Sequence, residues 1–102
     1  MFTKEWKFNL KHHQIHIIYH WHNVMKLYVD GDLRDFSELN LSFRDDVLLR
    51  TNLSEIGIID VTPSWSLLSL EVTVQLSQAS DRFIVYSSHE RVPLRAQRLI
   101  SK

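Results

Sequence analysis

Histidine is the residue type whose spacing in this chain best suits a metal site. Five of the six histidines fall within eleven residues, at positions 12, 13, 16, 20 and 22. In an extended strand, His20 and His22 point to the same face about 6.6 Å apart, and two imidazoles at this spacing can converge on one ion. A metal site needs a third ligand, and the sequence identifies none. We therefore predict no bound metal or cofactor, with His20 and His22 as the candidate ligands.

The same segment suits two other roles. Crowded imidazoles, which ordinarily titrate at about pH 6.5, repel one another once charged and could sense pH. Trp21 lies between two of these histidines, and together with Tyr28 it could form a stacking surface for a sugar or a base. The alternatives are a solvated strand face for the histidines and a core position for the tryptophan. Trp21 and Tyr28 are therefore candidate partner-binding residues.

Two shorter motifs resemble catalytic or metal sites only in composition. Ser87, Ser88, His89 and Glu90 are residue types found in hydrolases, but no nucleophile elbow or spaced partner accompanies them. Asp30, Gly31 and Asp32 lack the ligand series of a calcium loop, and their types are those of a tight turn. We therefore name no catalytic residue and expect the protein not to be an enzyme.

The end of the chain carries a basic stripe. The last twelve residues contain Arg91, Arg95, Arg98 and Lys102, which leaves 8 basic against 12 acidic residues, or −4, in positions 1 to 90. After Pro93 the apolar residues recur at helical spacing, so a short C-terminal helix is predicted. Its arginines are candidates for contact with an acidic protein or a nucleic acid. They would also complement the negative end of the helix dipole without any partner.

Composition limits the class of protein. The chain has 102 residues, which suits a single domain spanning positions 1 to 102, and 44% of them are hydrophobic. No apolar run approaches the roughly 20 residues that cross a bilayer, and the first residues lack the pattern of a secretory signal. Cysteine is absent. We expect a soluble cytoplasmic protein without disulfides.

Period-two alternation is the strongest structural signal in the chain. Apolar residues occupy positions 68, 70, 72, 74 and 76, with polar residues between them. Such a strand has one buried and one wet face. Similar strands are predicted at 5–10, 14–21, 24–29 and 38–44. The inward residues expected in the second of these strands are Ile15, Ile17, Tyr19 and Trp21.

The remaining segments complete a fold built mainly from β-strands. Asp30 and Gly31 predict a two-residue hairpin turn, and residues 32 to 37 fit either a bent strand or a helical turn. Strands at 47–49, 56–62 and 82–87 are apolar on both faces and therefore need cover on both sides. Pro63 is expected to separate the strand at 56–62 from the one at 68–76. These elements predict an antiparallel sandwich or partly open barrel.

The alternative is an α+β fold with a helix near residues 63 to 77. Trp65, Leu68, Val72 and Leu76 fit helical spacing. The β-branched run from Val72 to Val74 disfavours this alternative, because β-branched residues lose side-chain freedom in a helix.

We conclude from the sequence that the protein is a small non-enzymatic interaction module that forms a homo-oligomer, most simply a dimer. The apolar surplus on its two-faced strands is the basis for this expectation. The first alternative is a ligand-binding or metal-dependent enzyme domain that uses His20 and His22. The second is a nucleic-acid binder that uses the C-terminal arginines.

Overall fold

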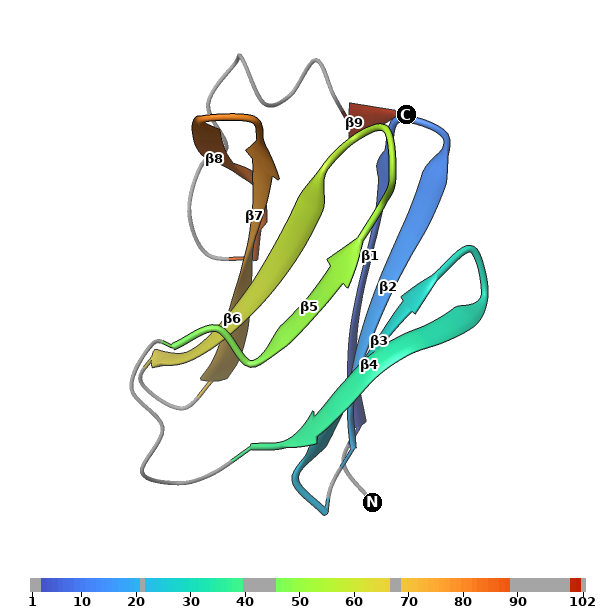
Figure 1. Ribbon diagram of the computed structural model, residues 1–102. Helices are drawn as coiled ribbons and strands as arrows, with labels where there is room; N and C mark the ends of the chain where they lie inside the picture. The colour runs from blue at the N-terminus through green and yellow to red at the C-terminus, as the bar shows by residue number, and fades with distance from the viewer. Residues whose placement is uncertain (1–2, 21, 40–45, 67–68, 89–99, 102) are drawn as a thin grey trace.

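Two antiparallel sheets form the protein. The computed structural model describes residues 3–20, 22–39, 46–66, 69–88 and 100–101. Sheet A has the strand order β4-β3-β2-β1-β9, and sheet B has the order β5-β6-β7-β8. Figure 1 shows the two sheets as the two layers of a sandwich. The strands of sheet A are β1 (Thr3–Leu10), β2 (His13–His20), β3 (Val24–Val29), β4 (Asp32–Glu38) and β9 (Ile100–Ser101). Those of sheet B are β5 (Leu49–Asn52), β6 (Ile58–Ser66), β7 (Ser69–Gln78) and β8 (Asp81–Ser87).

The predicted mainly β fold is confirmed, and it is the sandwich form. The alternative helix near residues 63 to 77 is wrong, because β6 and β7 cover this segment. The described residues contain no helix. The predicted C-terminal helix and Arg91, Arg95 and Arg98 fall within residues 89–99, outside the described residues.

The core lies between the two sheets and comes from the alternation seen in the sequence. In β7, Leu70, Val72, Val74 and Leu76 are buried, which confirms the predicted inward face; Leu68 lies outside the described residues. Sheet A contributes its alternate residues in the same way. Its buried positions are Trp6, Phe8, Leu10, Ile15, Ile17, Tyr19, Met25, Leu27 and Val29. Alternation therefore placed each of these strands correctly with respect to the core.

The hairpin turns use left-handed backbone conformations. Asp30 and Gly31 have φ values of 53° and 87°, as a two-residue turn of type I′ requires, so the predicted hairpin is confirmed. The segment that the sequence left ambiguous, residues 32 to 37, is extended and belongs to β4. The strand predicted at 47–49 begins later in the structure. β5 starts at Leu49, and Val47 and Leu48 lie before it.

Pro63 does not end a strand, as the sequence suggested, but lies inside β6 opposite Val72. The backbone nitrogen and oxygen of Val72 both bond to Ser88, on the β8 side. Pro63 and Val72 therefore form a pair without mutual backbone hydrogen bonds, and the nitrogen of Pro63 points away from β7. The pairing of β5 with β6 covers only 58 to 61, so this nitrogen faces no strand among the described residues. A proline is tolerated at such a position because no ladder bond is lost.

A bulge in β8 explains why that strand has no polar face. The register shifts between Val74 and Gln75, which leaves Val85 as the extra residue on β8. Phe83 lies opposite the buried Leu76 and Tyr86 opposite the buried Val74, so both turn inward. Val85 is fully buried as well. The bulge thus lets three of four consecutive apolar residues face the core.

Candidate functional site

The candidate metal ligands lie at the end of β2. β2 stops at His20, and the ring centroids of His20 and His22 are 6.0 Å apart in an edge-on arrangement. The carboxylates near in sequence do not complete a site. Asp30 lies in the turn between β3 and β4, at the opposite end of β2 from His20. Glu38 is on β4, two strands away from β2. Val24 of β3 lies between Glu38 and His20 and pairs with both. Among the residues that the structure describes, no group of three metal-ligating side chains comes together.

Two other histidines pair with carboxylates on neighbouring segments. Nε2 of His16 lies 2.7 Å from Glu5, which is on the adjacent strand β1. Nδ1 of His13 lies 2.7 Å from Asp30, and Asp30 also accepts a hydrogen bond from the backbone of Gln14. The bond from Gln14, followed by that of His13, lowers the pKa of Asp30 below its ordinary value. The His16 contact connects β1 with β2, and the His13 and Gln14 contacts hold the start of β2 against the β3–β4 turn.

The predicted aromatic surface is only partly described. Trp21 lies outside the described residues. Tyr28 is half-buried on the outer face of sheet A, the face turned away from the core, and its ring centroid lies 6.0 Å from that of His16. Tyr28 therefore belongs to a surface formed with other residues of sheet A.

Apolar side chains gather on this outer face. The strand register forms two rows across four strands: Glu5, Ile18, Lys26 and Phe36 in one, and Lys7, His16, Tyr28 and Leu33 in the next. Phe36 is 62% exposed and Leu33 is 47% exposed, and both lie on β4. Sequence reasoning missed these two residues, because β4 could not be distinguished from a helical turn.

The edge of sheet A at β4 is tied to sheet B by polar contacts. A register shift between Leu27 and Tyr28 makes Arg34 the extra residue of β4. Its terminal nitrogen Nη1 donates to Thr51 Oγ1 and to the Asn52 carbonyl oxygen, each at 3.3 Å. Asp35 accepts a hydrogen bond from the backbone nitrogen of Arg50 at 2.9 Å. The bulge and these contacts protect the edge from pairing with a strand of another chain.

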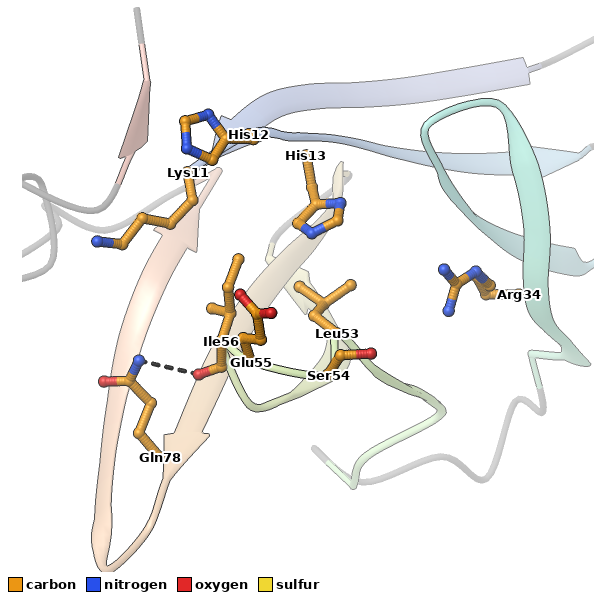
Figure 2. Close-up of a pocket in the computed structure, with 9 residues that line it drawn as sticks. All are labelled: Lys11, His12, His13, Arg34, Leu53, Ser54, Glu55, Ile56 and Gln78. Carbon is orange, nitrogen blue, oxygen red and sulfur yellow. Dashed lines mark hydrogen bonds between the residues drawn. The ribbon is translucent and has the colours of Figure 1, made fainter.

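A pocket opens at one end of the sandwich, where segments of both sheets meet (Figure 2). It has a volume of about 590 Å³. Figure 2 shows the β1–β2 turn on one side, the β5–β6 loop opposite it and Arg34 at a third side. The lining residues are Lys11, His12, His13, Arg34, Leu53, Ser54, Glu55, Ile56 and Gln78. Sequence reasoning did not find this pocket. It could identify only the two polar turns, and these are some 40 positions apart in the chain.

A close backbone approach fixes one wall of the pocket. Gly57 has a φ of 131°, and a Cβ atom there would collide with the carbonyl oxygen of Ser77. Gln78 donates from its side chain to the Ile56 carbonyl oxygen at 2.9 Å. The β5–β6 loop is therefore held against the end of β7 before any ligand is present.

The hydrolase-like segment has a structural role where the structure describes it. Ser88 donates to Glu71 at 2.6 Å and accepts from the backbone nitrogen of Val72 at 2.9 Å. Lys4, on sheet A, lies 3.6 Å from Glu71 and donates to the Leu70 carbonyl oxygen. Ser88 thus extends the pairing of β7 with β8, and Lys4 connects the two sheets.

Asp60 is a buried carboxylate that the sequence did not reveal. It is 2% exposed and lies on the outer face of sheet B. Arg50 on β5 bonds to it through two nitrogens, and Arg82 on β8 lies 3.1 Å from it. The two arginines compensate its burial and connect three strands, so we assign it a structural role.

Comparisons were made with protein-family models, curated proteins and solved structures. None of these comparisons finds a match to the chain. Within the described residues, no helix could reach across a membrane.

Proposed function

We propose that this protein is a small non-enzymatic interaction module that pairs with a second copy of itself through the outer face of sheet A. The observation that carries the proposal is the exposure of Phe36, at 62%, and Leu33, at 47%, on neighbouring rows of this face. Large apolar side chains gathered on one face are typical of association surfaces. Ile18 and Tyr28 extend the same surface toward the centre of the sheet.

The arrangement of charges on this face favours a second copy as the partner. In a two-fold dimer, each residue contacts a different residue of the same patch. We place the axis in the interface, perpendicular to the strands and between the two rows. Each residue of one row then lies over the other row on the same strand of the second copy. This alignment pairs Glu5 with Lys7 and Phe36 with Leu33. It also places Ile18 over His16 and Lys26 over Tyr28.

Three of these four pairings are chemically favourable. Glu5 and Lys7 have opposite charges, Phe36 and Leu33 are both apolar, and a lysine over a tyrosine ring gains a cation–π interaction. A face-to-face contact also leaves the protected edge of β4 unused, consistent with the bonds of Arg34 and Asp35 to β5. We further propose a cytoplasmic location, because the chain contains no cysteine for disulfides.

The polar groups singled out by the sequence support a role without catalysis. His13, His16 and Ser88 each bond to a carboxylate on a neighbouring segment, where they stabilise strand pairing. None of these bonds requires a substrate to explain it.

A matched pair of substitutions tests the proposal. Phe36→Ser removes the most exposed apolar side chain of the patch, whereas Ile58→Ser removes one that is 39% exposed on sheet B. We expect Phe36→Ser to raise the dimer dissociation constant about thirtyfold, which corresponds to about 2 kcal/mol. Ile58→Ser should leave it unchanged. Sedimentation equilibrium measures both constants, and equal values for the two variants would contradict the proposal.

A further inference from the structure

The pocket at the end of the sandwich carries an inference independent of self-association. Its volume of about 590 Å³ falls within the range of small-molecule sites. Its base is apolar: Leu53 is buried in the core, and Ile56 packs against it. Polar groups surround this base on three sides (Figure 2). A ligand that fits would therefore have an apolar body and a polar group at its rim.

The charged side chains that line the pocket determine which charge the polar group of a ligand should carry. Lys11 and Arg34 are cations, His12 and His13 add two imidazoles, and Glu55 is the lining carboxylate. Asp30 stands behind His13, bonded to its Nδ1. This bond orients the ring and leaves Nε2 as the nitrogen available to a ligand. The lining itself therefore has two cationic side chains, Lys11 and Arg34, and one carboxylate, Glu55.

Arg34 is held in place by sheet B. The two bonds from its Nη1 to Thr51 and Asn52 fix the guanidinium and leave its other nitrogens for further bonds. A guanidinium fork held in this way suits a carboxylate, because it can donate two parallel hydrogen bonds. We propose that this pocket binds a small organic carboxylate with an apolar body.

A pair of probes with the same shape and opposite charge tests the inference. Benzoate and benzamidinium both carry a phenyl ring, and they differ in the sign of the attached group. Each is titrated into the ¹⁵N-labelled protein, and the amide signals of residues 11–13 and 53–56 are followed by NMR. We expect saturable shifts with benzoate and none with benzamidinium. Saturable binding of benzamidinium, or no binding of benzoate, would overturn the inference.

Three substitutions assign the binding to the named charges. Arg34→Gln should weaken benzoate binding about tenfold, because a charge-assisted hydrogen bond pair is lost. Glu55→Gln should strengthen binding, because it removes the carboxylate that repels the ligand. Lys4→Gln, near the start of β1 and therefore at the opposite end of this strand from Lys11, removes a charge remote from the pocket and should leave the affinity unchanged.

The signs of these changes decide the outcome. Weaker benzoate binding by Glu55→Gln would mean that the pocket needs its carboxylate, which would overturn the inference. Equal losses in Arg34→Gln and Lys4→Gln would attribute binding to the overall charge and would also overturn it. Amide spectra of the three variants without ligand establish that each is folded.

Discussion

Phe8 of β1 and Tyr86 of β8 stack across the core with ring centroids 4.5 Å apart and planes within 3° of parallel. This contact joins an inner strand of sheet A to an edge strand of sheet B. It depends on the bulge in β8, because the bulge turns Tyr86 inward after Phe83. Burial raises the pKa of the Tyr86 hydroxyl above its ordinary value, and the nearby Glu71 adds to the shift. The sandwich is therefore closed by contacts between residues far apart in the chain.

The two faces of β7 should respond differently to an added charge. Val72 is fully buried, whereas Thr73 lies on the outer face and is half-buried. Val72→Asp should lower the free energy of unfolding by about 3 kcal/mol or more, because it buries an unpaired carboxylate. Thr73→Asp should cost less than about 1 kcal/mol. Urea denaturation measures both values, and equal costs would refute the assigned faces.

The two glycines should tolerate a methyl group unequally. Both have positive φ, but an added Cβ meets no atom within 4 Å at Gly31 and collides with backbone at Gly57. Gly31→Ala should cost about 1 kcal/mol for the left-handed conformation alone. Gly57→Ala should cost more than about 2 kcal/mol, because the β5–β6 loop must move away from β7. Thermal melts compare the stabilities of the two variants. A smaller loss of stability for Gly57→Ala than for Gly31→Ala would contradict the close contact between Gly57 and Ser77.

Asp30 should make stability depend on pH in the acid range. Its folded pKa is lowered from 3.8 by the bonds from Gln14 and His13. The stabilisation it provides is therefore present above about pH 4 and is lost as the pH falls through the lower folded pKa. The difference in melting temperature between the wild type and Asp30→Asn should shrink below pH 4. Asp32→Asn is the matched control, and its melting temperature should stay close to that of the wild type at every pH. The same pH dependence in both variants would argue against the contacts of Asp30.

Stability should not depend on a metal ion. His20 and His22 form a pair without a third ligand among the described residues. A pair of imidazoles alone does not hold a structural zinc ion. Treatment with a chelator should leave the melting temperature unchanged, and elemental analysis should find far less than one metal per chain. One tightly bound metal ion per chain would show that the site is complete.

Local patterns in the sequence were sufficient to predict the strand faces. Leu70, Val72 and Val74 alternate with polar residues, and the period of a strand is a local property. The turn at Asp30 and Gly31 was predictable for the same reason, because the positive φ values that a type I′ turn requires favour these residue types.

Features that depend on neighbouring strands could not be predicted in this way. Pro63 is accommodated because its nitrogen faces no strand among the described residues. This depends on where β5 ends its pairing with β6, which covers only residues 58 to 61 of β6. The inward turn of Tyr86 depends on a bulge that exists only in the pairing of β7 with β8. The pocket brings Lys11 and Arg34 to the β5–β6 loop through the packing of two sheets. Each of these requires the tertiary arrangement.

Self-association through the outer face of sheet A should make the mass of the untagged protein in solution depend on its concentration. Light scattering across a concentration series at low micromolar levels and above should give a mass that rises with concentration. It should approach twice the 12.1 kDa of one chain. A mass near 12.1 kDa at every concentration would rule out self-association.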